Sequence, residues 1–186
     1  MDNSAFKIVG VLTLIGLISG GALAGVYKAA SPRIEKHRIA ALKKAIFEVL
    51  PQAKDYREEE KDGLTAYYGI DDKQNPVGIA FEASGNGFQA KITMMVGIDN
   101  KFEKLTGMKV LYQIETPGLG NKIEFEDFTK QFQGLSVSPE IGYVKNVKPD
   151  KPNEIQAITA ATISSAAVVK ILNKEIKKMS EKFKAS

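Results

Sequence analysis

The sequence predicts an α+β protein with one N-terminal apolar helix, one antiparallel sheet and one C-terminal amphipathic helix. A long uncharged segment opens the chain, and several short strand-like segments separated by turn residues follow in its middle. Its C-terminal part repeats apolar side chains at helical spacing. The 186 residues are 44% apolar and 26% charged, a composition that suits one modest globular domain.

The first predicted element is a helix long enough to cross a membrane. Residues 8–26 contain no charged side chain, and at about 1.5 Å per residue they nearly cross a hydrocarbon layer of about 30 Å. We therefore expect a membrane anchor within residues 1–30. A cleaved secretory signal is the alternative, because Lys7 precedes the apolar run and Ala22-Leu23-Ala24 resembles a cleavage site.

The surroundings of this apolar segment bear on its partners and on the side of the membrane. Gly16 with Gly20, and Gly21 with Gly25, are pairs at a spacing that lets another membrane helix pack closely. More basic residues follow the segment than precede it, which favours a cytoplasmic domain by the positive-inside rule. Long domains cross membranes largely regardless of charge, so the pattern leaves the side open.

A stalk helix and a series of strands follow the predicted anchor. Ser31 suits an N-cap, Pro32 suits the first helical position and Pro51 suits the end, which predicts a helix over residues 31–50. The charged residues 55–62 are expected to form a loop. Strands separated by turn residues are then expected at 64–70, 77–83, 89–98 and 104–113.

The rest of the predicted domain, which spans residues 51–186, contains shorter elements and a final helix. Phe125, Phe128 and Phe132 recur at helical spacing, and we expect all three rings in the core. Two short extended segments and an amphipathic helix complete the domain, at residues 141–147, 154–158 and 163–182.

Composition excludes several kinds of chemistry. The chain contains no cysteine, which rules out disulfides, thiolate nucleophiles and cysteine-ligated zinc or iron–sulfur sites in this chain. Its single histidine, His37, argues against a histidine-dependent triad or a multi-histidine metal site. The 26 basic and 22 acidic residues are interspersed, so we expect no nucleic-acid partner.

Two loops contain more glycine, proline and small hydroxyl residues than a turn requires. In Glu115-Thr116-Pro117-Gly118-Leu119-Gly120, an apolar side chain stands between two glycines, whose bare backbone would let a flat ring with polar edges approach. A buried leucine plug would use the same pattern. The second loop, Ile158 to Ser165, is a run of small and hydroxyl side chains where a strand should become a helix. The free N–H groups of such a helix start suit a phosphate.

Together the two loops resemble the paired signatures of the FMN-binding domain found in the G subunit of the Rnf electron-transport complex and in the C subunit of the sodium-translocating NADH:quinone reductase. The first signature reads E-T-P-G-L-G, which residues 115–120 match at every position. The second reads S/T-G-A-T-x-S/T, which residues 159–164 match except at Ala160, where that family usually has glycine. Gln156 stands where an aspartate often lies in that family.

This resemblance implies that a separate flavin transferase, with FAD as donor, esterifies the phosphate of FMN to the hydroxyl of Thr162. The chain would then be a non-catalytic redox carrier that works with other membrane and redox subunits of an ion-translocating ferredoxin/NAD complex. It would cross the cell (inner) membrane once, with its domain outside the cytoplasm. The residues expected to hold FMN belong to the two loops and the helix start, and they are Thr162, Glu115, Thr116, Gly118, Leu119, Gly120, Thr159, Ala160, Ala161, Ile163, Ser164 and Ser165.

Two other classes of function are compatible with parts of the sequence. A membrane-anchored binding or assembly module without a cofactor would leave the loop at residues 115–120 purely structural. A secreted hydrolase could use Glu115 with Glu124 or Glu126, but no spacing in the sequence fixes two acids across a cleft. A mature chain beginning at Gly25 would favour a secreted protein over a membrane subunit.

Overall fold

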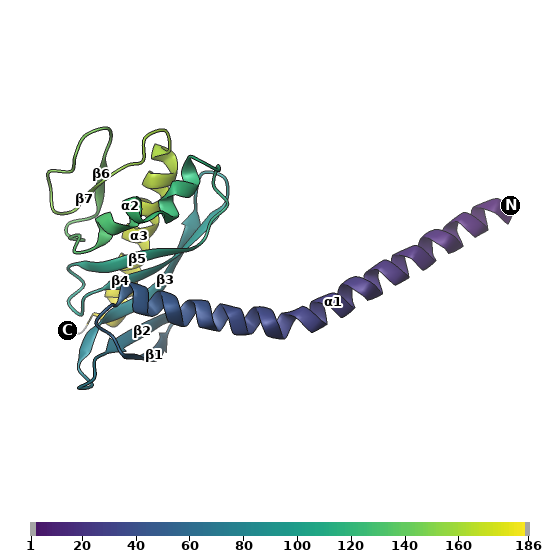
Figure 1. Ribbon diagram of the computed structural model, residues 1–186, viewed down its shortest axis with the longest axis horizontal. Coiled ribbons are helices and arrows are strands. Elements are labelled where there is room, and N and C mark those ends of the chain that lie inside the picture. Colours follow the sequence, from purple (N-terminus) through teal and green to yellow (C-terminus); the bar gives the residue numbers. More distant parts are fainter. Residues whose placement is uncertain (1–2, 185–186) are drawn as a thin grey trace. The chain divides into compact units, whose positions relative to one another are not determined.

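A computed structural model describes residues 3–184 (Figure 1). Side chains are described from Phe6 onward. Contacts between residues divide the chain into two units, and the boundary along the chain falls between Lys43 and Lys44. The described part of the first unit is helical, and the second unit contains every described strand together with the last turns of the N-terminal helix.

The N-terminal helix, α1 (Asn3–Val49), is continuous. The predicted helix start at Ser31 is wrong, because α1 runs through Pro32 and the hydroxyl of Ser31 donates to the carbonyl of Tyr27 at 2.8 Å. A proline inside a helix removes one backbone hydrogen bond and can kink the helix, but the helix can continue on both sides of it. The boundary between an anchor at residues 1–30 and a stalk at 31–50 falls within this helix and stays a prediction.

The apolar part of α1 has the length and composition of a membrane span. Its mean hydropathy reaches 2.1, and none of the side chains in this apolar window is buried. Among the described residues it is the one helix that meets these criteria, although a secretory signal near an N-terminus meets them too. One crossing of a membrane is therefore compatible with the structure.

The second unit is built on a five-stranded antiparallel sheet whose strands follow one another in chain order, which confirms the predicted fold class. The prediction of a loop over residues 55–62 is wrong, because this segment forms the edge strand β1, which pairs with β2 from Asp55–Ile70 to Lys61–Leu64. Charged side chains are typical of an edge strand and hide the alternation that marks a half-buried one. The five strands are β1 (Asp55–Lys61), β2 (Leu64–Ile70), β3 (Pro76–Asn86), β4 (Lys91–Ile98) and β5 (Leu105–Tyr112).

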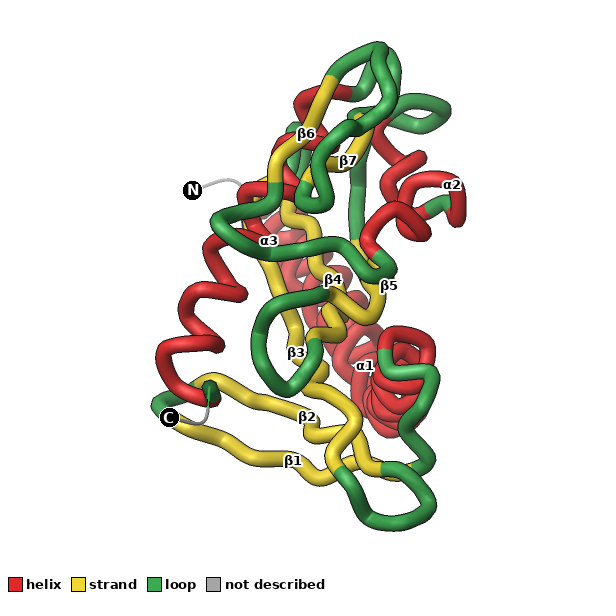
Figure 2. Tube along the Cα trace, turned by 90° about the vertical axis from the view of Figure 1, so that its left-hand side faces the viewer, coloured by secondary structure: helices red, strands yellow, loops and turns green. Residues whose placement is uncertain are grey.

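One long helix, α3 (Thr162–Phe183), packs along the sheet, chiefly on β3 (Figure 2). Its apolar face buries Val168 and Leu172 completely. They join a core cluster that also contains Phe81 of β3 and Val96 of β4. Because this packing fixes α3 on the sheet, it also fixes where the first turn of α3 lies relative to the loops at the sheet's end.

Short elements connect β5 to α3, namely η1 (Gly120–Glu124), α2 (Glu126–Thr129), η2 (Lys130–Phe132) and the parallel pair β6 (Gly142–Val144) and β7 (Glu154–Gln156). Phe128 and Phe132 are buried and meet edge to face, with ring centroids 5.3 Å apart. The expectation that Phe125 is also in the core is wrong, since 49% of it is exposed. Phe125 has an extended backbone between η1 and α2, so the helical spacing of the three rings is interrupted there.

Candidate functional site

The fold brings the two loops together at one pocket. The first loop follows β5, and the second connects β7 to α3. Between them lies a pocket of about 310 Å³, which we call the two-loop pocket. Its lining residues come from both loops and from the turn after β3, and they are Phe88, Thr116, Leu119, Gly120, Ala160, Ala161, Thr162, Ile163 and Ser164.

A buried carboxylate joins the walls of this pocket. Glu115 is 3% exposed, and its Oε2 accepts a hydrogen bond from the hydroxyl of Ser164 at 2.5 Å. Its Oε1 accepts from the backbone N–H groups of Gln89 at 3.0 Å and of Ala90 at 3.5 Å. Glu115 therefore connects the first loop to the start of α3 and to the turn between β3 and β4.

The hydrogen bonds to Glu115 keep its carboxylate ionised. Burial alone would raise its pKa, but the Ser164 hydroxyl and the N–H groups of Gln89, Phe88 and Ala90 together hold the pKa below the ordinary value. Glu115 does not line the two-loop pocket. Its side chain points into the protein, so it lies behind the pocket wall and not on its surface.

The two glycines of the first loop have different roles. Gly118 has a φ of +75° with open space around it, so its role is conformational. A Cβ on Gly120 would lie 2.7 Å from Ser164 Oγ and 2.9 Å from Glu115 Cβ, so this position allows the two loops to approach each other. Leu119, between them, is 41% exposed at the pocket. That exposure argues against the buried leucine plug.

The first turn of α3 presents N–H groups at the same pocket. Ala161 occupies the N-cap position without a side-chain cap, and the first three N–H groups of a helix, here on Thr162, Ile163 and Ser164, have no carbonyl partner within the helix. Ser165, which is among the residues expected from the sequence to hold FMN, has no free N–H to offer, because that group donates to the carbonyl of Ala161 at 3.1 Å. The start of α3 one residue earlier than predicted explains this difference.

Ser165 braces the second loop from inside. It is fully buried, and its hydroxyl accepts from the N–H of Ile158 at 3.0 Å and donates to the carbonyl of Ala161 at 3.0 Å. Ala160, in the same loop, has a φ of +65°, which is unusual for a residue with a side chain. Thr159 is turned away from the two-loop pocket, and its Oγ1 lies 3.5 Å from Asn146 Oδ1.

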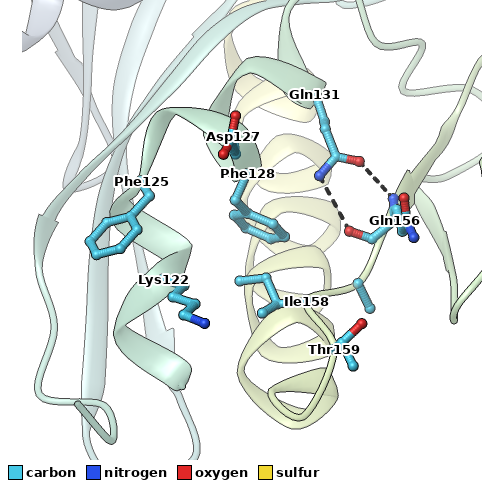
Figure 3. A pocket seen from close by; sticks show the side chains of 9 residues that line it. Lys122, Phe125, Asp127, Phe128, Gln131, Gln156, Ile158 and Thr159 are labelled. Atoms are coloured by element: carbon cyan, nitrogen blue, oxygen red, sulfur yellow. Dashed lines mark hydrogen bonds between the residues drawn. The ribbon is translucent and has the colours of Figure 1, made fainter. Parts of the chain in front are cut away.

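Thr159 lines a separate pocket of about 390 Å³, between the segment from Gln156 to Thr159 and the short helices (Figure 3). Here the side-chain amide of Gln131 holds the main chain of Gln156. The N–H of Gln156 donates to Gln131 Oε1 at 2.8 Å, and Gln131 Nε2 donates to the carbonyl of Gln156 at 3.3 Å. This clamp fixes the chain just before the second loop.

Sequence reasoning missed two residues of this arrangement, Phe88 and Gln131. Phe88 is 58% exposed in the turn after β3, directly following Gly87. A glycine beside an aromatic residue indicates a ring at the surface, but it does not indicate which residues lie next to that ring. The clamp by Gln131 has no sequence signal, because it depends on where η2 and β7 meet. Within the described residues, no group of three His, Asp or Glu side chains is placed to hold a metal ion.

Comparison with known proteins identifies the class of this domain. Residues 87–177, which contain both loops, match the family described as the FMN-binding domain. Two solved structures share the fold at a TM-score of 0.57. NqrC of Shewanella oneidensis is 17% identical over 69% of this chain and 66% of its own. The C subunit of the Na⁺-translocating NADH-quinone reductase of Parabacteroides distasonis is 22% identical over 66% of this chain and 63% of its own.

Curated relatives are similar over nearly the whole chain. The G subunit of the ion-translocating oxidoreductase complex of Methanosarcina acetivorans is 33% identical over 91% of this chain and 92% of its own length. The G subunit of the Na⁺-translocating ferredoxin:NAD⁺ oxidoreductase complex of Acetobacterium woodii is 29% identical over 92% and 89%. The chain belongs to the family of the G subunits of ion-translocating oxidoreductase complexes.

Proposed function

We propose that this chain is the electron-transfer subunit of a membrane-bound, ion-translocating oxidoreductase of the ferredoxin:NAD type, and that it carries FMN joined through its phosphate to Thr162. One observation carries the proposal. Thr162 lies in the wall of a single pocket that both loops line, at a helix start whose N–H groups have no partner within the helix. The names of the relatives supply the class of complex.

The residues of the two-loop pocket fit the parts of FMN. A phosphodiester on Thr162 keeps one negative charge, which the N–H groups of Thr162, Ile163 and Ser164 and the helix dipole would stabilise, the dipole by about 0.3–1 kcal/mol. The exposed apolar side chains of Phe88, Leu119 and Ile163 suit a flat ring. When bound, the flavin supplies the redox chemistry, and this chain positions it.

Attachment needs a second protein, a flavin transferase with FAD as donor. The Thr162 oxygen forms a bond to the flavin-side phosphorus, the bond from that phosphorus to AMP breaks, and the hydroxyl proton is released. This step involves no oxidation or reduction. Thr162 is partly buried and lines the pocket, and its partial exposure supports access by such an enzyme.

We also propose a location for the protein in the cell membrane. The apolar part of α1 would cross the cell (inner) membrane once, beside other membrane and redox subunits. The domain would lie on the extracytoplasmic side. That side rests on the resemblance to the FMN-binding subunits and not on the charge pattern around the span.

The attachment site can be tested by expressing the full chain with a flavin transferase. After denaturation, we expect ultraviolet fluorescence that stays with the wild-type protein band and disappears in Thr162→Ala. Thr162→Ser keeps a hydroxyl and should keep the fluorescence. Fluorescence that persists in a folded Thr162→Ala protein, checked by circular dichroism, would exclude Thr162 as the acceptor. A colourless wild-type protein would favour the cofactor-free assembly module.

A further inference from the structure

We propose that the buried carboxylate of Glu115 lowers the midpoint potential of the flavin in the two-loop pocket while it holds the two loops together. This inference rests on the proposed function, because it requires a flavin at Thr162. It makes Glu115 a positioning residue with an electrostatic effect, since its side chain does not line the pocket.

Glu115 lies directly behind the pocket wall. Two residues that line the pocket, Gly120 and Ser164, both approach it. The Ser164 hydroxyl donates to its Oε2 at 2.5 Å, and a Cβ on Gly120 would lie 3.2 Å from the same oxygen. A charge on this carboxylate is thus separated from the pocket by only one layer of small residues.

The charge on Glu115 is stabilised but not neutralised. Its partners are one hydroxyl and backbone N–H groups, and no lysine or arginine in the described part of the chain forms an ion pair with it. Dipolar donors keep a carboxylate ionised without supplying a compensating charge. In this buried environment, the negative charge opposes the addition of an electron to a neighbouring ring, because like charges repel more strongly at low dielectric.

The same hydrogen bonds explain why the walls of the pocket are held together. The N–H group of Glu115 donates to Gln113 Oε1 at 2.6 Å, so its own backbone is held as well as its carboxylate. A Cβ on Gly87, in the turn after β3, would lie 2.5 Å from Glu115 Oε1. The turn that carries Phe88, the first loop and the start of α3 therefore all pack around one carboxylate.

The inference is tested on the full chain, flavinylated by coexpression, with redox titrations followed by flavin absorbance at about pH 8, well above the ordinary carboxyl pKa. Glu115→Gln removes the charge but keeps the shape, since its Oε1 can accept from the backbone and its Nε2 can donate to Ser164 Oγ. We expect its midpoint potential to rise above that of wild type. Glu126→Gln removes an exposed charge on α2 and should leave the potential unchanged.

Ser164→Ala is a second test variant, for which we expect the midpoint potential to shift in the opposite direction. It keeps the carboxylate but removes the hydroxyl whose dipole screens it, so the potential should fall. A purely structural role for Glu115 would move both variants in the same direction. An unchanged or lowered potential in Glu115→Gln overturns the inference, and so does a raised one in Ser164→Ala. A wild-type chain without covalent flavin instead overturns the proposed function, and the inference with it.

Discussion

At the scale of single residues, Ala160 shows that the second loop is held in a conformation its sequence does not favour. Its φ of +65° places the Cβ close to the following carbonyl oxygen. This conformation costs an L-residue about 1–2 kcal/mol. The neighbouring bonds explain why the conformation persists. The N–H of Ala161 donates to the carbonyl of Ile158 at 3.0 Å, and Ser165 braces the same loop. The surrounding structure therefore imposes the backbone at this position.

We expect Ala160→Gly to stabilise the protein by about 0.5–1 kcal/mol. Glycine adopts a positive φ without strain, and this gain should exceed the larger conformational entropy that glycine loses on folding. Urea unfolding in detergent, followed by circular dichroism, measures the change. Ala157→Gly is the matched control, since Ala157 lies just before the same loop without a positive φ, and glycine should not stabilise the protein there. A loss of stability in Ala160→Gly would show that this backbone is not strained.

The residue scale also shows how much of the site is predictable from the sequence. The sequence pattern predicts a ligand-binding loop at residues 115–120 and a phosphate-binding helix start at 158–165, and the fold brings the two together. The direction of each side chain could not be predicted, because it depends on the residue at which α3 begins. With the helix starting at Thr162, Ser165 turns inward and its N–H is already bonded.

At the scale of elements, long strands with apolar alternation were predictable and short or charged ones were not. β2 to β5 lie within a few residues of their predicted limits, because each alternates or buries apolar side chains between clear turn residues. β1 is stabilised by its pairing with β2, and that pairing leaves no pattern in a charged edge sequence. Tertiary contacts determine such elements.

The clamp between η2 and the end of β7 is an interaction of this kind. We expect Gln131→Ala to lower the free energy of unfolding by about 1–3 kcal/mol, because it leaves the N–H and carbonyl groups of Gln156 without their partner. Gln133→Ala, at an exposed position nearby, should change it little. Urea unfolding compares the two variants. Equal stabilities would mean that water replaces the Gln131 side chain.

At the scale of the whole molecule, the end of α1 belongs to the core of the second unit. Ala45, Ile46, Val49 and Leu50 are almost completely buried. The hydroxyl of Thr106 donates to the carbonyl of Val49 at 2.6 Å. A Cβ on Gly97 would clash with that same oxygen, so this glycine allows the close approach of helix and sheet. One helix thus continues from the apolar segment into the domain core.

This continuity predicts where the chain can be shortened. A chain beginning at Lys44 lacks the apolar segment and should leave the membrane fraction as a folded domain, whereas the full chain should resist carbonate extraction. A chain beginning at Gln52 also loses the buried Ile46, Val49 and Leu50. At about 1.5–3 kcal/mol for each such side chain, the loss approaches the whole stability of a typical domain of about 5–15 kcal/mol. We therefore expect cooperative thermal unfolding from the Lys44 chain and none from the Gln52 chain. Equal melting temperatures would show that the last turns of α1 are dispensable, and that the helix is only a tether.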